Sequence, residues 1–242
     1  NFRWTTNFTY SWNKNEIIEL AANAVNPVTG EALNLTKLDI KGLGKAKYIL
    51  KEGGTLGDLY TTSNLRFNDN GYVEVDKNGN LLMTDEGEDI YLGSVFPNHN
   101  LAWRNDFSYK GINLGVLFTA RLGGVCYSAT QANLDLYGVS EASAAARDAG
   151  GVLINGREMV DAQKWYQAIG SQSGLPQYYL YSATNVRLQE LSLGYTFPRK
   201  WFRNKLGLTV SFVGRNLWMI YCKAPFDPEA VASTGLNLSL IH

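Results

Sequence analysis

The chain lacks a long apolar run and an excess of charge of one sign. No segment of its 242 residues approaches the ~20 apolar residues of a membrane-spanning helix. This excludes a helical membrane protein, but not one that crosses with strands of about 9–11 residues. Lys and Arg number 22, as do Asp and Glu. Because proteins that bind nucleic acid usually carry a clustered basic excess, we expect no nucleic-acid partner.

Recognisable catalytic and metal-binding patterns are also missing. The two histidines are far apart in sequence, and there is no His-x-x-x-His, Cys-x-x-Cys or Gly-x-Ser-x-Gly motif. Asp76, Asn78 and Asn80 mimic the start of a calcium loop, but the required sixth-position Gly is Leu81. We therefore expect no enzyme, no metal site and no cofactor.

The chain has two cysteines, Cys126 and Cys222. In the topology predicted below, one strand separates them, so their backbones lie ~10 Å apart. A disulfide needs Cα atoms within ~7 Å. We expect two free thiols.

The chain is rich in aromatic residues and in alternating apolar and polar residues. Aromatics make up 12% of it. In residues 206–213, Leu206, Leu208, Val210 and Phe212 share one face, and mostly small or polar residues share the other. In a soluble sandwich the apolar face would pack in a core. In an outer-membrane barrel it would face lipid, and the polar face would line the lumen.

The same alternation predicts seven spanning strands, at residues 2–12, 16–20, 101–109, 112–122, 184–197, 206–216 and 236–242. The turn residues 13–15 favour a short hairpin between the first two, and Lys110-Gly111 favours another tight turn. The eleven in-phase residues of 112–122 exceed the usual strand of ~5–6 and favour a spanning strand. A phase slip near Gln189-Glu190 predicts a β-bulge.

Three regions between these strands are predicted as long extracellular loops, at about 21–100, 125–183 and 217–235. The first contains repeated turn signals and short strand candidates at 45–51, 56–61 and 72–75. The second contains helical patterns near 140–149 and 158–169. Loops of this length are where binding tends to occur.

Several phrases of the sequence carry a family resemblance. VRLQELSLGYTFP, GRNLW and APFDPEA follow one another near the C-terminus, and SWNKNEI, KYILKEGGTLGDLY, GSVFPNHNLAWRNDFSYKGINL, ARLGG and LYGVSEASAAARDAGG precede them. In this order the chain resembles the SusC/RagA-like TonB-dependent outer-membrane transporters. The resemblance implies an all-β fold. The whole chain, 1–242, would be an antiparallel transmembrane β-barrel segment, the C-terminal part of a plugged barrel of about 22 strands.

Seven strands are too few to close such a barrel, and open sheet edges are not tolerated in lipid. We therefore expect a piece of a longer protein whose N-terminal plug is absent from this chain. A further loop is expected near Gly235, and His242 departs from the aromatic residue that usually ends the family's chains.

The resemblance also implies a function: active import of a nutrient across the outer membrane of a Gram-negative, Bacteroidetes-like bacterium. TonB would act through the missing N-terminal part, and a SusD-like surface lipoprotein would be the partner. The ligand would be a glycan or, in the alternative, a peptide. Two other hypotheses stay open: a soluble carbohydrate-binding or adhesive β-sandwich, which would not need detergent, and a passive porin-like channel.

Candidate site residues fall into three sets. Loop aromatics able to stack on a ligand or contact a partner are Trp165, Tyr166, Tyr178 and Tyr179; loop packing is their alternative role. Basic residues expected on the lumen side, able to contact plug or ligand or to form salt bridges, are Arg104, Arg121 and Arg187. Aromatics expected at the boundary with outer-membrane lipid are Trp12, Trp201, Phe202 and Trp218. For the basic turn around Trp201, the alternative is a solvated turn with a buried Trp.

Overall fold

The structure is a computed structural model that describes residues 2–21, 25–32, 35–84, 87–171 and 173–229. These residues divide into two compact units. The first takes in described residues of 1–14, 96–124 and 182–230, and the second those of 15–95 and 125–181. None of the helices in the described ranges is long and apolar enough to cross a membrane.

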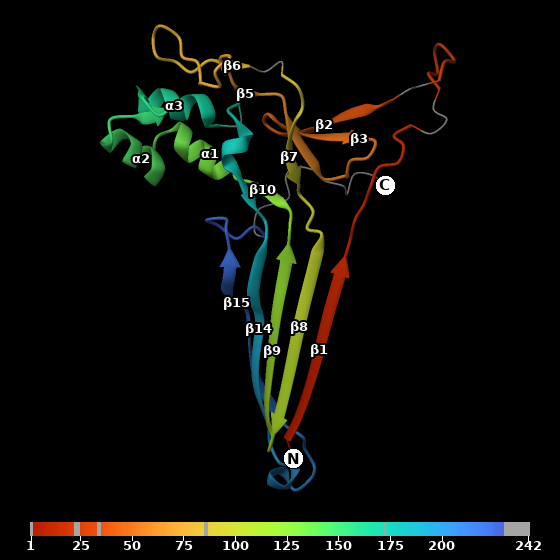
Figure 1. Cartoon of the computed structure of the whole chain (residues 1–242). Coiled ribbons are helices and arrows are strands. Elements are labelled where there is room, and N and C mark those ends of the chain that lie inside the picture. The colour runs from red at the N-terminus through yellow and green to blue at the C-terminus, as the bar shows by residue number, and fades with distance from the viewer. Residues whose placement is uncertain (1, 22–24, 33–34, 85–86, 172, 230–242) are drawn as a thin grey trace. The chain divides into compact units, whose positions relative to one another are not determined.

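The first unit is a five-stranded antiparallel sheet with the strand order β1-β8-β9-β14-β15 (Figure 1). Its strands are β1 (Phe2–Trp12), β8 (His99–Tyr109), β9 (Ile112–Leu122), β14 (Asn185–Thr196) and β15 (Thr209–Cys222). β8 and β9 form a hairpin. Lys110 and Gly111 both have positive φ, 47° and 90°, as the predicted two-residue turn requires.

The register keeps the alternation of the sequence intact across all five strands. One row of paired residues runs Trp4, Phe107, Leu114, Leu193 and Phe212, and all of them are apolar. The neighbouring row, one residue along each strand, points to the other face. Its members are mostly small or polar: Thr5, Asp106, Gly115, Ser192 and Val213. The sheet therefore has one apolar and one polar face.

The bulge predicted in the fourth strand is confirmed. The register of β14 shifts between Leu188 and Glu190 against both of its neighbours, β9 and β15. The extra residue, Gln189, brings the apolar residues on either side of it onto the same face.

Other strand predictions were wrong. Residues 16–20 form no strand, and β1 pairs with β8 instead of with an adjacent return strand. β15 continues to Cys222, so the loop expected from residue 217 begins after that residue. The strand expected at 236–242 lies outside the described residues.

The sandwich hypothesis does not fit the first unit. A sandwich strand buries one of its two faces, whereas every residue of β1 from Phe2 to Trp12 is exposed. Trp4, Phe8 and Trp12 on the apolar face are each more than half exposed. Soluble monomers rarely leave an apolar face of this extent uncovered.

The second unit contains a four-stranded antiparallel sheet with the order β2-β3-β4-β7. Its strands are β2 (Lys37–Leu43), β3 (Ala46–Lys51), β4 (Asp58–Thr61) and β7 (Ile90–Ser94). The short strands predicted at 45–51 and 56–61 are thereby confirmed. The one predicted at 72–75 amounts to isolated bridges at Val73 and Val75. Three two-stranded pairs complete the unit's strands: β5 (Asn64–Leu65) with β6 (Met83–Thr84), β10 (Val125–Tyr127) with β13 (Leu180–Ser182), and β11 (Val152–Ile154) with β12 (Glu158–Val160).

Three α-helices lie in the second unit: α1 (Ala129–Leu136), α2 (Glu141–Asp148) and α3 (Ala162–Ile169). Ser128, Ser140 and Asp161 cap their N-termini by accepting backbone N–H bonds. The sequence predicted α2 and α3 but missed α1. Short 3-10 helices are η1 (Pro176–Tyr179) in this unit and η2 (Arg199–Phe202) in the first.

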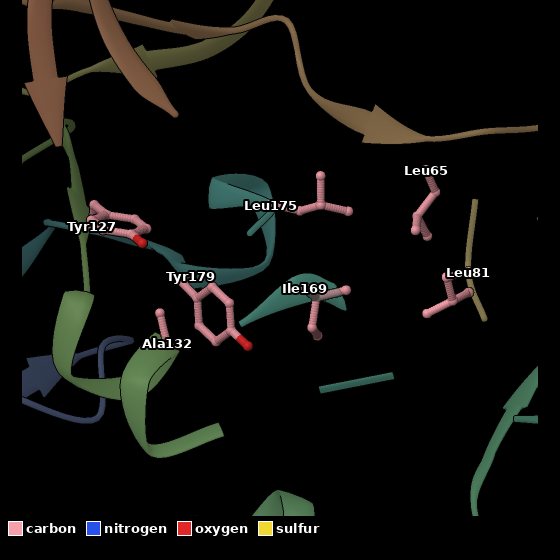
Figure 2. Packing of buried hydrophobic residues seen from close by; sticks show 7 residues of the cluster. All are labelled: Leu65, Leu81, Tyr127, Ala132, Ile169, Leu175 and Tyr179. Carbon is pink, nitrogen blue, oxygen red and sulfur yellow. The ribbon is translucent and has the colours of Figure 1, made fainter. Parts of the chain in front are cut away.

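A hydrophobic core holds α1, α3 and η1 of the second unit together (Figure 2). Buried residues from five elements, one isolated bridge position and the residue before η1 meet in it: Leu65, Leu81, Tyr127, Ala132, Ile169, Leu175 and Tyr179. Because full burial of each large apolar side chain contributes about 1.5–3 kcal/mol, this cluster accounts for the order of a region that the sequence describes as loop.

Candidate functional site on the polar face of the sheet

Four charged side chains form a network across the middle of the polar face. Arg104 on β8 pairs with Asp106 at 2.9 Å and with Glu190 on β14 at 3.3 Å. Glu190 also pairs with Arg215 on β15 at 3.2 Å. The network joins three strands, and its charges balance.

Gly115 on β9 leaves the room that this network needs. A Cβ at this position would lie 2.4 Å from Oγ of Ser192, 3.0 Å from Oδ1 of Asp106 and 3.3 Å from Nη2 of Arg104. The residue thus lets the Arg104 side chain reach from β8 over β9 to β14.

A second network lies at the end of the sheet where β9 and β14 meet. The guanidinium of Arg187 donates to both carboxylate oxygens of Asp227, at 2.8 and 3.2 Å, and lies 3.2 Å from Glu229. Glu229 also pairs with Arg121 at 3.3 Å. The Arg187 side chain is only 5% exposed, so its charge would be costly to bury without these carboxylates.

The segment after β15 therefore folds back against the polar face. It forms one wall of a cavity of about 300 Å³, which Arg187, Asn216, Met219 and Asp227 also line. The sequence analysis named Arg104, Arg121 and Arg187 but missed the acidic partners Asp227 and Glu229. Their signal is the motif APFDPEA, which carries both carboxylates.

Of the aromatic residues expected at a lipid boundary, Trp12, Trp201 and Trp218 are exposed, and Phe202 is half-buried. Trp12 ends β1, and Trp218 lies on β15 opposite Leu188 of the apolar face. Trp201 is 67% exposed, which excludes the alternative of a basic turn around a buried Trp. Trp201 and Phe202 both contact the ring of Phe197, at centroid distances of 5.8 and 6.4 Å.

The four loop aromatics do not form one exposed platform. Trp165 and Tyr178 make an edge-to-face contact at 5.9 Å, and Tyr178 is exposed. Tyr166 packs against the core of the second unit. Tyr179 is 2% exposed and belongs to that core, so its ring offers no surface on which a ligand could stack (Figure 2). For Tyr179 the packing role holds and stacking on a ligand was the wrong expectation.

Burial changes the acid–base properties of these tyrosines. Burial is the main cause that raises the pKa of Tyr179, with the charge of Asp135 adding to it. Burial also raises the pKa of Tyr178 and, together with Asp135, that of Tyr166. All three phenols therefore stay protonated and neutral at physiological pH.

No group of three or more metal-ligating side chains occurs within the described ranges. Asp76 instead closes its own turn, because its carboxylate accepts bonds from the backbone N–H groups of Asn78 and Asn80. Cys126 and Cys222 are not joined by a disulfide, in line with the prediction.

Comparison with known proteins connects this two-faced sheet with transport. The chain is 25% identical over 252 residues to TonB-dependent receptor P3 of Formosa agariphila. The match covers 95% of this chain and 23% of the relative. The resemblance to TonB-dependent transporters is confirmed. No family model matches the chain.

Solved structures confirm the fold. The structure of the RagAB peptide transporter matches with a TM-score of 0.59 and 20% identity, over 94% of this chain and 25% of that chain. The RagAB peptide importer in its open-open state matches with a TM-score of 0.58 and 19% identity, over 95% and 24% of the two chains. The predicted fold class, a segment of an antiparallel transporter barrel, is thereby confirmed.

The chain spans about a quarter of the length of the proteins that it matches. These are described as a receptor and as transporters, not as enzymes, in agreement with the sequence analysis. The likeness indicates the outer membrane of a Gram-negative bacterium.

Proposed function

We propose that this chain supplies part of the barrel wall of an active importer in the outer membrane. The observation that carries the proposal is the two-faced sheet, combined with the match to a TonB-dependent receptor along almost the whole chain. The apolar face meets lipid, and the polar face with its two ion-pair networks lines the lumen. The regions 21–100, 125–183 and the part after β15 are the extracellular loops of this wall.

The energy source and the partner follow from the family resemblance. TonB acts on an N-terminal plug that is not part of this chain, and a SusD-like surface lipoprotein caps the barrel. Arg104, Arg121 and Arg187 stabilise the wall through their ion pairs and present the remaining polar surface to plug or cargo.

The cargo is a nutrient molecule, with an oligosaccharide and a short peptide as the two candidate classes. The loop pair Trp165 and Tyr178 favours a glycan, because aromatic rings can stack on the apolar faces of sugars. The likeness to the RagAB peptide importer favours a peptide. An aromatic-rich loop alone does not separate the two.

Uptake by living cells tests the proposal. A strain that lacks the complete gene is given fluorescent oligosaccharides and fluorescent peptides in separate experiments. We expect one class to accumulate in the parent strain, and to be lost both in the deletion strain and in a parent strain without TonB. If uptake is lost in the deletion strain but is unchanged in the parent strain without TonB, the protein is a passive channel. Unchanged uptake of every compound after deletion would contradict an import function.

A further inference from the structure

The three helices of the second unit enclose a cavity of about 330 Å³ that the import hypothesis does not by itself explain. Asp135 enters it from the C-terminal end of α1, and Arg147 from α2. Tyr166 and the amide side chains of Gln163 and Gln167 enter it from α3. All of these residues belong to one compact unit.

Asp135 is the most unusual group in this cavity, because its carboxylate is buried without a cation. The residue is 5% exposed, and the side-chain amide of Gln131 donates to its Oδ1 at 3.0 Å. None of the salt bridges found among the described residues involves it. A buried carboxylate is costly unless a positive charge accompanies it.

The phenol groups of Tyr166, Tyr179 and Tyr181 lie near this carboxylate. Tyr179 is 2% exposed, and its Oη has no hydrogen-bond partner in the described part of the chain. The charge of Asp135 contributes to the raised pKa values of Tyr179 and Tyr166, which places both hydroxyls within its electrostatic reach. The surroundings of Asp135 therefore combine a carboxylate, phenol oxygens and aromatic rings, a set that is complementary to an ammonium group. The C-terminal end of α1 adds a negative helix dipole.

We propose that this cavity binds the amino-terminal end of a short peptide, with the ammonium group at Asp135. The peptide's first amide groups meet Gln163 and Gln167, whose side chains offer both donors and acceptors. Arg147 donates one bond to the backbone oxygen of Gly138 at 2.7 Å, and its other N–H groups face a peptide carbonyl. A neutral sugar would leave the charge of Asp135 without a cation. The inference rests on the proposed import function only in naming the class of cargo.

Calorimetric titration of the full-length protein in detergent tests the inference. The probes are trialanine with a free amino terminus and its N-acetylated form, which differ in the ammonium group. We expect the free form to bind at least tenfold more tightly. Equal affinities, or no binding of the free form at millimolar concentration, would overturn the inference. This comparison needs no variant and so does not depend on how a substitution affects folding.

Two substitutions locate the binding to the cavity. Asp135→Asn keeps the shape and an acceptor for Gln131 and should abolish the preference for the free amino terminus. Asp148→Asn on the exposed side of α2 removes a carboxylate outside the cavity and should leave it unchanged. If Asp135→Asn fails to fold, Tyr166→Phe takes its place. We expect this variant to bind trialanine with a free amino terminus several-fold more weakly. A preference that persists in a folded Asp135→Asn variant, or an affinity that is unchanged in Tyr166→Phe, contradicts the assignment.

The uptake experiment keeps this inference separate from the proposed function. Peptide uptake that depends on the gene, without a preference for a free amino terminus, would reject the cavity as the site and leave the importer intact. A clear preference in titration, without any uptake, would support the site and reject the importer.

Discussion

The indole Nε1 of Trp4 donates a hydrogen bond to Oδ1 of Asn105, 3.2 Å away on the neighbouring strand. Asn105 is buried among apolar residues on the apolar face of the sheet, and the indole of Trp103 makes an equivalent bond to Oγ1 of Thr6 beside it. Both indole N–H groups on this part of the face thus have an acceptor in the next strand. That is a requirement for a surface in contact with lipid, where no water replaces a missing bond.

This pair predicts a non-additive mutational effect. Asn105→Leu leaves the Trp4 indole without an acceptor and should destabilise the assembled protein by about 1–3 kcal/mol. Trp4→Phe combined with Asn105→Leu removes both polar groups and should recover part of that loss. Unfolding in detergent, followed by the shift between folded and unfolded bands in electrophoresis, measures both. Strictly additive effects would show that the bond contributes nothing.

Phe212 and Val213 are neighbours on β15 that point to opposite faces. They are 77% and 54% exposed, so neither is held in a protein core. Phe212→Arg places a charge on the lipid face and should cost up to about 2–4 kcal/mol, depending on its depth. Val213→Arg places the same charge on the lumen side and should assemble nearly normally. The amount of each variant in outer-membrane fractions tests this prediction. Equal reductions in the amounts of the two variants would contradict the assignment of the faces.

Arg187 should be the most sensitive of the predicted basic residues. Arg187→Met removes the buried guanidinium that holds the carboxylates of Asp227 and Glu229, so the segment after β15 should loosen, although Glu229 keeps its pair with Arg121. Hydrogen exchange should show that residues 223–229 lose protection. Arg3→Met, on the polar face of β1 and exposed, is the matched control and should leave exchange there unchanged. Protection that survives in Arg187→Met would mean that other contacts hold the segment.

The raised pKa of Tyr179 predicts a loss of stability at high pH. Folding favours the neutral phenol, so the stabilisation is fully present below the ordinary tyrosine pKa of about 10 and is lost as the pH rises above it. Tyr179→Phe removes the titrating group and an unpaired hydroxyl, and should be at least as stable as the parent protein at neutral pH. Thermal unfolding between pH 8 and about pH 11, followed by tryptophan fluorescence, should show a smaller decline for the variant. Parallel declines would contradict this account.

The sequence predicted the local periodicity of the sheet well and its pairing less well. The strand at 112–122 and the bulge near Gln189 both follow from side-chain alternation, which is a local property. The partner of β1 does not follow, because the turn residues at 13–15 suit a hairpin that the chain does not make. The actual partner, β8, begins at His99. In the sequence, the four-stranded sheet of the second unit lies between β1 and β8.

The site was predicted in its basic residues but not in its contacts. Alternation assigned Arg104 and Arg187 to the polar face, yet Glu190, the second partner of Arg104, comes from another strand, and the partners of Arg187 come from the segment after β15. Tyr179 was misassigned because a tyrosine in a loop-like sequence looks the same whether it is exposed or buried. Helix α1 was not predicted because it buries only two of its residues, Ala132 and Asp135, and its sequence shows little amphipathic pattern.

The bulge at Gln189 makes β14 a strand assembled from two alternating runs that differ by one residue in phase. Elsewhere in β14, an insertion or deletion of a single codon would turn part of the strand over, exchanging charged and apolar side chains between lumen and lipid. Without Gln189, Leu188 and Glu190 would still pair with Phe118 and Leu117 of β9 on their present faces. Gln189 is therefore the position in β14 at which natural length variation among relatives should be found.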